Sequence, residues 1–450
     1  MRMTVIGTGY VGTVHAACMA DIGHQVLGLD IDADRIASLS AGRAPLHERG
    51  LDELLARNVA SGRLRFSTSL AEGAAFAGTH FVCVGTPQRP DGGAADLRHV
   101  DAVVDGLAPR LRPGSLLVGK STVPVGTAAR IAARLAGTAP GTEVAWNPEF
   151  LREGSAVQDT LRPERLVVGV ASPHAEEVLR EVYAPMITVG VPFFSTDPAT
   201  AELVKVAANA FLATKISFIN AMAEVCDAAG ADVSFLARAI GADSRIGPRF
   251  LSPGLGFGGS CFPKDIRAFA ARAEEIGAGE AVAFLHEVDR INTRQRRRTV
   301  DRARRLLGGS FTGRRIAVLG AAFKPGSDDV RDSPALAVAA ALREQGAEVR
   351  VHDPEALDNA RAVRPELAYA LEVDKACEDA DLVLHLTDWP AYRSLDPVAL
   401  ASLVRSPVLL DARNALDPHL WSAAGWAVHA PGRPGLSPSA ASAAPAGGAS

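Results

Sequence analysis

The segment from residue 3 to residue 30 constrains the fold of this chain more than any other. A short apolar run at 3–6 predicts a buried strand, and Gly7-Thr8-Gly9-Tyr10-Val11-Gly12 follows it directly. An alanine-rich stretch then predicts a helix, residues 25–29 predict a second strand, and Asp30 closes that strand. This order of strand, glycine turn, helix, strand and acid is typical of a dinucleotide-binding βαβ unit. For the glycines alone, an ordinary strand–helix turn is the alternative.

The residue types of this unit fit a dinucleotide in specific ways. Gly7 and Gly9 permit a tight turn and a close approach of the backbone to the pyrophosphate, and the helix N-terminus holds that anion. We expect Asp30 to accept hydrogen bonds from the adenosine ribose, which favours NAD over NADP. Asp32 would also repel a 2′-phosphate, although Arg35 weakens this argument.

Further strands and helices predict an α/β fold with a doubly wound parallel sheet, whose ligands bind at the carboxyl ends of the strands. The additional strands are predicted at 81–84, 115–118, 144–146 and 165–170. Two strand ends, Val84-Gly85-Thr86-Pro87 and Lys120-Ser121-Thr122-Val123-Pro124, are therefore candidate ligand contacts, although turn chemistry alone could explain either one.

A long helix follows this first unit. Asp197 is suited to cap it and Pro198 to be its first residue, and the helical pattern continues to Gly230. About 30 helical residues extend roughly 45 Å at 1.5 Å per residue, a length that often bridges domains. Apolar residues on several of its faces predict that it also forms the interface of a homodimer.

A second α/β unit begins near residue 314, with strands predicted at 315–319, 348–352, 381–386 and 407–410. The fold is therefore expected to contain two Rossmann-like doubly wound domains joined by a long central helix. We predict an NAD-binding domain at 1–196, a central helical region at 197–310, a second α/β domain at 311–430 and a disordered tail rich in Pro, Ala, Gly and Ser at 431–450.

Composition excludes several classes of function. A net charge of −4 without a basic stripe predicts no nucleic-acid binding. The five cysteines are scattered and form no Cys-x-x-Cys, which predicts neither a disulfide framework nor a metal site. No signal-peptide pattern is visible, and no uninterrupted apolar run reaches the ~18–20 residues of a membrane span. We therefore expect a reduced, cytoplasmic protein that does not bind membranes.

A glycine-rich loop places one cysteine at a predicted helix N-terminus. The run Gly254-Leu255-Gly256-Phe257-Gly258-Gly259-Ser260-Cys261-Phe262-Pro263-Lys264-Asp265 predicts a helix that begins at Pro263. The helix N-terminus and Lys264 both favour a thiolate at Cys261. A thiolate beside a dinucleotide site indicates covalent chemistry on a carbonyl, whereas a buried cysteine closing a tight loop is the alternative.

Together these motifs resemble one family. The matching segments are Gly-Tyr-Val-Gly at 9–12, Val-Gly-Thr-Pro at 84–87, Ser-Thr-Val-Pro at 121–124, Asn-Pro-Glu-Phe-Leu-Arg-Glu-Gly at 147–154, the cysteine loop, Phe-Lys-Pro at 323–325, Arg-Asp-Ser-Pro at 331–334 and Asp-Ala-Arg-Asn at 411–414. The chain resembles the UDP-glucose/GDP-mannose dehydrogenase family over about residues 1–430, and most closely its UDP-glucose 6-dehydrogenase branch.

The resemblance implies NAD-dependent oxidation of a UDP-sugar, with the sugar nucleotide bound by the C-terminal domain and the site closing between domains. The expected reaction converts C6 of UDP-glucose to the carboxylate of UDP-glucuronate, using two NAD. The alternatives are the same chemistry on GDP-mannose or a UDP-N-acetylhexosamine, a non-catalytic sugar-nucleotide sensor, and a simple two-electron hydroxyacid dehydrogenase.

The resemblance also implies catalytic roles. Cys261 would add to the aldehyde and form a thiohemiacetal and then a thioester. Lys205 and Asn209 share a helix face and would contact the reacting oxygens; Lys205 could also take the first proton, although from the helix alone a surface pair with Glu202 is the simpler reading. Glu149 would order the hydrolytic water, supported by Thr122 and Asp265.

Two larger sets of contacts complete the expected site, which contains no metal. The residues expected to contact NAD are Gly7, Gly9, Tyr10, Val11, Gly12, Asp30, Arg35, Thr86, Pro87, Ser121, Thr122, Glu153, Lys264 and Arg331. The residues expected to contact the substrate are Glu149, Phe150, Leu151, Arg152, Glu153, Lys205, Asn209, Arg245, Ser252, Pro253, Gly254, Leu255, Gly256, Phe257, Gly258, Cys261, Phe323, Lys324 and Arg413.

Overall fold

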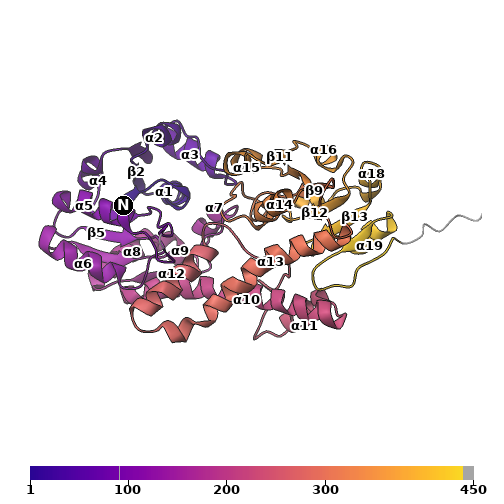
Figure 1. The fold of residues 1–450 in the computed structure, drawn as a ribbon. Coiled ribbons are helices and arrows are strands. Elements are labelled where there is room, and N and C mark those ends of the chain that lie inside the picture. Colours follow the sequence, from indigo (N-terminus) through magenta and orange to yellow (C-terminus); the bar gives the residue numbers. More distant parts are fainter. Residues whose placement is uncertain (91, 439–450) are drawn as a thin grey trace, which may run out of the picture. The chain divides into compact units, whose positions relative to one another are not determined.

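The computed structural model describes residues 1–90 and 92–438, which form two compact units. The first unit contains Met1–Asn209 and Lys264–Val282, and the second contains Ala210–Pro263 and the chain from Ala283 onward. The predicted central region at 197–310 is thus shared between the two units. The predicted α/β class is confirmed, since each unit is built on a largely parallel sheet (Figure 1).

The first unit contains an eight-stranded sheet. In spatial order its strands are β3 (Leu64–Ser67), β2 (Gln25–Leu29), β1 (Arg2–Ile6), β4 (Thr79–Val82), β5 (Leu116–Gly119), β6 (Glu143–Trp146), β7 (Leu166–Gly169) and β8 (Phe193–Thr196). Neighbours are parallel except β6 and β7, which pair antiparallel through Trp146 and Gly169. The strand order reverses between β1 and β4, the position at which doubly wound sheets bind ligands.

Helices cover this sheet on both faces. They are α1 (Tyr10–Asp21), α2 (Ala33–Ser40), α3 (Leu51–Ala60), α4 (Leu70–Phe76), α5 (Arg98–Leu107), α6 (Thr127–Thr138), α7 (Ala156–Leu161), α8 (Pro173–Val182), α9 (Ala184–Thr188), the first part of α10 (Pro198–Ala229) and most of α12 (Phe262–Glu275). Two short 3₁₀ turns lie at Ala108–Arg110 and Gly279–Val282. Alternate residues of β5 enter two different cores: Leu116 and Val118 pack in one cluster and Leu117 in the other.

The second unit contains a six-stranded, entirely parallel sheet. Its strands, in spatial order, are β11 (Ala368–Tyr369), β10 (Glu348–His352), β9 (Arg315–Leu319), β12 (Leu382–His385), β13 (Val408–Asp411) and β14 (Ala427–His429). Its helices are the remainder of α10, α11 (Val233–Gly241), α13 (Phe284–Leu306), α14 (Pro334–Glu344), α15 (Leu357–Val363), α16 (Val373–Cys377), α17 (Pro390–Arg393), α18 (Pro397–Ala401) and α19 (Pro418–Ala423).

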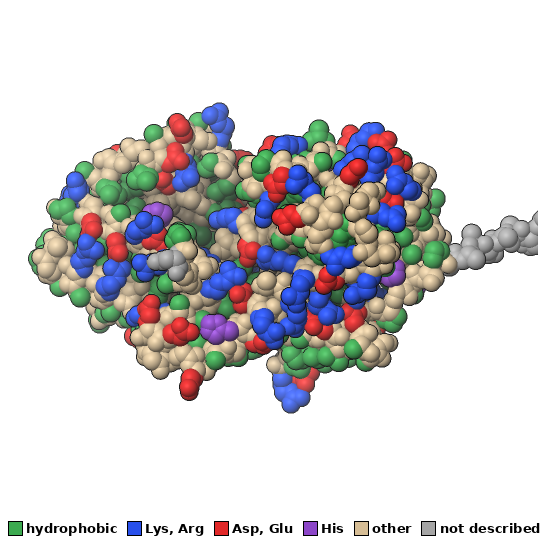
Figure 2. Space-filling view, in the orientation of Figure 1, with side chains coloured by type: hydrophobic (Ala, Val, Ile, Leu, Met, Phe, Trp, Pro, Cys, Tyr) green, Lys and Arg blue, Asp and Glu red, His purple; other side chains and the backbone are tan. Residues whose placement is uncertain are grey.

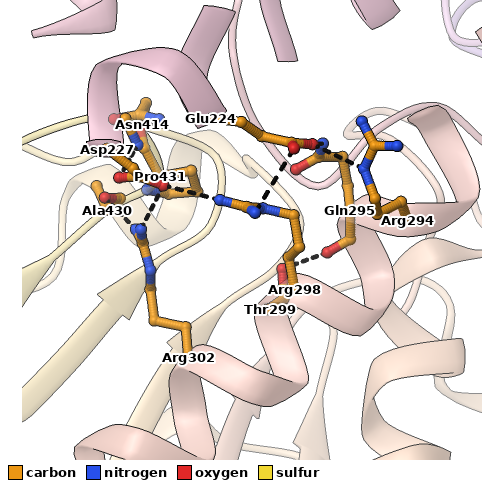
Figure 3. Close-up of polar contacts among 11 residues, drawn as sticks. Glu224, Asp227, Arg294, Gln295, Arg298, Thr299, Arg302, Asn414, Ala430 and Pro431 are labelled. Atoms are coloured by element: carbon orange, nitrogen blue, oxygen red, sulfur yellow. Dashed lines mark hydrogen bonds and ion pairs between the residues drawn. The ribbon is translucent and has the colours of Figure 1, made fainter. Parts of the chain in front are cut away.

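Ion pairs join α13 to α10 within the second unit. Lysine and arginine side chains gather over α13 on the surface (Figure 2). Arg298 and Arg302 both reach Asp227, at 3.2 and 2.6 Å, and Arg294 lies 3.1 Å from Glu224 (Figure 3). Arg294, Arg298 and Arg302 are therefore paired with acids of α10.

The same network holds residues that the sequence predicts to be disordered. The N–H of Gly432 donates to Asp227 at 2.8 Å, Arg302 donates to the carbonyl of Ala430, and Leu436 pairs with Val428. The prediction of a disordered tail from residue 431 is therefore wrong for 431–438, because backbone hydrogen bonds and the packing of Leu436 against the core of the second unit fix this segment. Residues 439–450 lie outside the described chain.

The helix α10 is both long and apolar. Its most apolar 18-residue window has a mean hydropathy of 1.3, and within residues 1–90 and 92–438 it is the one helix that by length and composition could cross a membrane. Yet 44% of that window is buried inside the protein, as in a core helix, and the helix also carries buried polar residues such as Lys205 and Asn209. Composition is therefore weak evidence for a membrane role.

Candidate active site

The turn between β1 and α1 is shaped by glycine. Gly7 has φ +89°, and a Cβ on Gly12 would lie 1.8 Å from the carbonyl oxygen of Gly7. A Cβ on Gly9 would meet nothing within 4 Å, so the backbone there is open toward any ligand. The helix that follows has Gly9 at its N-cap and no side-chain cap, which leaves its first N–H groups available to an anion. These features fit the pyrophosphate of NAD.

Asp30 lies at the end of β2, beside this turn. Its carboxylate accepts hydrogen bonds from the backbone N–H of Thr8 at 2.7 Å and of Asp32 at 3.1 Å, and from Arg35 at 3.2 Å. Burial alone raises the pKa of Asp30, but these donors and the Arg35 charge outweigh it and lower the pKa. Arg35 lies against Asp30 and within 3.6 Å of Asp32, so its charge is compensated within the loop.

Tyr10 and Glu48 anchor the segment 150–154 to α1. The Tyr10 hydroxyl donates to Glu48, and the N–H of Gly154 donates to Glu48 at 2.7 Å and to Tyr10 at 3.0 Å. Glu48 also accepts from Ala156 at 2.8 Å. Sequence reasoning missed this role of Glu48, because its burial becomes visible only in the structure.

Side chains connect the strand ends at the sheet's switch point. Thr86 donates to the carbonyl of Thr122 at 2.7 Å, and Ser121 donates to the carbonyl of Val84 at 2.6 Å. Both predicted contacts therefore also hold the β4 and β5 loops together. Of the other residues predicted to contact NAD, Pro87 lies in the loop after β4 and Val11 lies in the first turn of α1.

Lys205 and Glu149 meet in the interior of the first unit. Lys205 is 5% exposed, and its Nζ lies 3.3 Å from Oε1 of Glu149. The other Glu149 oxygen accepts from the N–H of Leu151 at 2.8 Å. Glu202, the alternative partner on the helix, instead accepts from Gly126 and Ala128 at the start of α6, at 2.7 Å each. The surface-pair reading of Lys205 is therefore wrong.

Asn209 lies one helical turn after Lys205 and contacts α12. Its amide donates to Asp265 Oδ2 at 2.7 Å, and the other oxygen of Asp265 lies 2.6 Å from Lys264 Nζ. Thr122 lines the same small pocket as Lys264 and Asp265. The structure therefore brings five predicted residues of the first unit into two groups. In one, Lys205 of α10 contacts Glu149 of the 147–154 loop. In the other, Asp265 of α12 contacts Asn209 of α10 and its neighbour Lys264.

Cys261 belongs to the second unit and directly precedes α12, which begins at Phe262, one residue before the predicted start. The thiol is exposed, with Ser260 Oγ 3.6 Å from its Sγ. The preceding glycines pack against backbone and rings: a Cβ on Gly258 would lie 2.3 Å from the carbonyl oxygen of Asp332, and one on Gly259 would lie 2.6 Å from the Phe323 ring. Larger residues would push the cysteine loop out of place.

Two buried asparagines, which sequence reasoning missed, hold this loop. Asn292 of α13 accepts from the N–H of Phe257 at 2.8 Å and donates to its carbonyl at 3.0 Å. Asn220 of α10 accepts from the N–H of Gly254 at 2.8 Å. No local signal marks them, because the buried face of α13 carries Gln295 and Thr299 beside Asn292.

Arg413 joins two predicted substrate segments, at Gly256 and Phe323, to the end of β12. It donates to the carbonyls of Leu386 at 2.6 Å, Gly256 at 3.0 Å and Phe323 at 3.5 Å. Burial lowers its pKa to about 10. In this geometry Arg413 ties the cysteine loop to the ends of β9 and β12, and Lys324 lies 5.4 Å from the neighbouring Phe323 ring.

Three predicted arginine contacts are instead mostly exposed and paired with nearby acids. Arg152 pairs with Asp159, Arg245 with Asp243 and Arg331 with Asp329, at 2.6, 2.6 and 2.7 Å. Their roles toward substrate and NAD stay predictions, as do those of Phe150, Glu153, Ser252, Pro253 and Leu255. Across residues 1–90 and 92–438, no group of three or more His, Cys, Asp or Glu is arranged to hold a metal.

Comparison with known proteins gives consistent matches along the chain. Residues 1–187, 199–294 and 317–418 match the NAD binding, central and UDP binding domains of the UDP-glucose/GDP-mannose dehydrogenase family. UDP-glucose 6-dehydrogenase of Rhizobium meliloti (strain 1021) is 43% identical, covering 92% of this chain and 95% of that protein. UDP-glucose 6-dehydrogenase TuaD of Bacillus subtilis (strain 168) is 42% identical, covering 97% and 94%. A solved UDP-glucose dehydrogenase from Pyrobaculum islandicum superposes with a TM-score of 0.85 at 41% identity, covering 92% and 94%.

Proposed function

Since the chain belongs to the UDP-glucose/GDP-mannose dehydrogenase family, we propose that it oxidises C6 of UDP-glucose to the carboxylate of UDP-glucuronate with NAD. Relatives named for this activity, similar over nearly their whole length, support the choice of substrate. The observation that carries the proposal is the buried Lys205–Glu149 pair, with Asn209 one turn away on the same helix. Together these groups can supply a base, a carboxylate that orders water and a hydrogen-bond donor to an oxyanion.

Lys205 removes the alcohol proton in the first oxidation. Its ammonium, once formed, stabilises the developing negative charge on oxygen, and the Asn209 amide donates a second hydrogen bond to that oxygen. Asp265 holds Asn209 in place, because it accepts from the amide at 2.7 Å. NAD, when bound, accepts one hydride in each of the two oxidations.

Cys261 retains the aldehyde for the second oxidation. Its thiolate adds to the carbonyl carbon and gives a thiohemiacetal, and loss of the second hydride leaves a thioester. Glu149 orders a water molecule that cleaves the C–S bond, which releases the carboxylate and restores the thiol. In balance, one alcohol, one water and two NAD yield one carboxylate, two NADH and three protons.

The second unit supplies the nucleotide contacts in this proposal. Arg413 fixes the backbone at Gly256 and Phe323 through their carbonyl groups, and in this proposal the two loops contact the uridine diphosphate. Lys324 adds a cation that suits a diphosphate. Because Cys261 must remain a thiol, a reducing cytoplasm suits this chemistry.

The apolar stripe of α10 supports a homodimer. Phe211, Phe218 and Val225, spaced by seven residues, share one helix face and are 66%, 48% and 56% exposed. Light scattering at micromolar concentration tests this proposal; a monomeric mass would refute it, and Phe218→Glu is expected to dissociate the dimer.

The experiment that tests the activity counts NADH per sugar nucleotide consumed. Purified protein receives excess NAD and limiting UDP-glucose, and then GDP-mannose or a UDP-N-acetylhexosamine. Two NADH per UDP-glucose with little reaction of the others is the expected result. One NADH would mean that oxidation stops at the aldehyde, and no NADH from UDP-glucose would refute the choice of substrate.

A further inference from the structure

Arg296 of α13 is a half-buried arginine that the mechanism above does not use. Its Nη1 donates to a carboxylate oxygen of Asp332 at 2.8 Å, and its Nη2 donates to the backbone carbonyl of the same residue at 3.4 Å. Its Nε is buried and has no hydrogen-bond partner among the described residues, so part of the cost of burying this guanidinium is not offset. The pair is therefore a weak source of stability.

Asp332 has an unusual backbone conformation. Its φ is +46°, in the left-handed region that residues other than glycine seldom adopt. Aspartate and asparagine tolerate this region better than most residues, but the surroundings still have to hold it. One guanidinium, that of Arg296, binds both the carboxylate and the carbonyl of Asp332. The pair therefore fixes the direction that the chain takes from Arg331 to Ser333.

The loop that contains Asp332 contacts the cysteine loop directly. The N–H of Gly259 donates at 2.9 Å to the carbonyl of the residue before Asp332. Gly258 lies so close to Asp332 that a Cβ on this glycine would be 2.3 Å from the Asp332 carbonyl oxygen. The carbonyl that Arg296 binds is therefore the one on which Gly258 packs, and Cys261 follows three residues later.

Arg296 also lies one helical turn after Asn292, on the same face of α13. Asn292 binds both the N–H and the carbonyl of Phe257. The helix therefore holds the cysteine loop at two successive points, directly at Phe257 and, just after it, through Asp332.

We propose that Arg296 and Asp332 are positioning residues, which set the location of the Cys261 thiol for its attack on the bound aldehyde. The inference rests on the proposed function, in which Cys261 acts only in the second oxidation. A displacement of a reacting group by about 1 Å can lower the rate of its step by up to about a hundredfold. Loss of the pair should therefore slow the second oxidation and spare the first, which depends on Lys205 and Asn209.

The test separates the two oxidations by giving the full-length protein the 6-aldehyde of UDP-glucose under saturating cofactor. With NAD and water, the aldehyde is oxidised to the carboxylate and one NADH forms, which requires Cys261 to add to the carbonyl carbon. With NADH, the aldehyde gains a hydride and a proton and becomes UDP-glucose, which does not require the thiol. Arg296→Met should lower kcat for aldehyde oxidation about tenfold or more and change kcat for aldehyde reduction by less than about twofold.

Arg294→Met is the matched control. Arg294 lies two residues earlier on α13 and pairs with Glu224 of α10 at 3.1 Å, and its side chain is 22% exposed against 19% for Arg296. The control thus removes an equally buried arginine and an ion pair from the same helix. If Arg296 only stabilised α13, both variants would affect oxidation and reduction alike. We expect Arg294→Met to keep both rates close to those of the wild type.

Variants of Asp332 test the pair from its other side. Asp332→Ala removes the acceptor and should reproduce the selective loss of oxidation, and combining it with Arg296→Met should add no further loss, because one contact can be removed only once. Asp332→Asn keeps an acceptor oxygen and tolerates the same backbone conformation, so it should restore aldehyde oxidation to near the wild-type rate.

Each outcome decides the inference. Equal losses of oxidation and reduction in Arg296→Met, unchanged oxidation, the same selective loss in Arg294→Met, or losses that multiply in the double variant overturn it. If Arg296→Met loses cooperative thermal unfolding, Asp332→Ala takes its place with the same expected result. A wild-type protein that neither releases NADH from UDP-glucose nor oxidises the aldehyde refutes the proposed function instead, so the two failures are distinguishable.

Discussion

A single methyl group at residue 12 should disrupt the dinucleotide turn. The Cβ of Gly12→Ala would lie 1.8 Å from the carbonyl oxygen of Gly7, whereas a carbon and an oxygen in contact stay about 3.3 Å or more apart. The start of α1 must therefore retreat by about 1.5 Å from the turn. Overpacking of this kind costs about 1–3 kcal/mol. For a unit of this size that loss lowers Tm by roughly 3–10 °C.

Gly9→Ala is the matched variant, because it adds the same methyl group three residues earlier. Gly9 has φ −68° and its Cβ would meet nothing within 4 Å, so alanine fits the unliganded protein. Loss of glycine at an N-cap costs only a few tenths of a kcal/mol up to about 1 kcal/mol. The new methyl group instead occupies the space through which the backbone approaches the pyrophosphate. NAD affinity should fall about tenfold or more, which is about 1.4 kcal/mol.

Thermal unfolding without ligand and calorimetric titration with NAD separate the two effects. Gly12→Ala should lose both stability and affinity, and Gly9→Ala should lose affinity with a Tm close to that of the wild type. A wild-type Tm in Gly12→Ala would refute the packing argument. Unchanged NAD affinity in Gly9→Ala would place the pyrophosphate away from this turn.

Three further predictions concern other parts of the chain. Cys261→Ser should still bind NAD and UDP-glucose but form little acid; near-normal acid production, measured by chromatography, would exclude the thioester route. Asn292→Ala leaves the buried N–H and C=O of Phe257 without partners, which should cost about 2–4 kcal/mol in unfolding free energy and disorder the cysteine loop; equal denaturation midpoints would contradict this. Burial lowers the pKa of His80 to about 4, so the unfolded chain binds this proton first as pH falls below about 6.5, and stability should decline by about 2 kcal/mol between neutrality and about pH 5. His80→Asn should reduce this fall in stability. The free energy of unfolding, measured by denaturation at about pH 7 and about pH 5, would refute the assignment if it fell equally in the variant and the wild type.

Local patterns predicted most of the fold because each element carries its own signal. The β1 turn, the Pro198 helix start and the buried strands of the second unit combine apolar periodicity with glycine or proline at the boundaries. The strand β3 (Leu64–Ser67) was missed because Arg65 and Ser67 dilute its apolar content, and β8 because it lies exposed at the sheet edge. The antiparallel pairing of β6 and β7 depends on the path of the segment that connects the two strands, and no local sequence pattern encodes that path.

The candidate site was predictable where chemistry restricts the residue type. Cys261 was singled out by its glycine loop and helix start. Lys205 and Asn209 were predicted only through the resemblance to the family, and the catalytic roles of all three stay predictions. The supporting residues were not predicted, because Asn220 and Asn292 act on backbone groups that are distant in sequence. An amide in a helix becomes interpretable only when the loop that it binds is known.

The helix α10 shows why neighbouring polar positions differ in role. Glu202 and Lys205 are three residues apart, a spacing that by itself favours an ion pair. In the structure the N-terminus of α6 takes Glu202 through two backbone N–H groups, and the partial positive charge of a helix N-terminus suits a carboxylate. Lys205 then pairs with Glu149, on a different segment. The position of α6 therefore decides which carboxylate faces the proposed catalytic lysine. Glu202 itself is not a predicted substrate contact, but its substitution should still alter catalysis, because it would free the start of α6 and so affect the helix that carries Lys205.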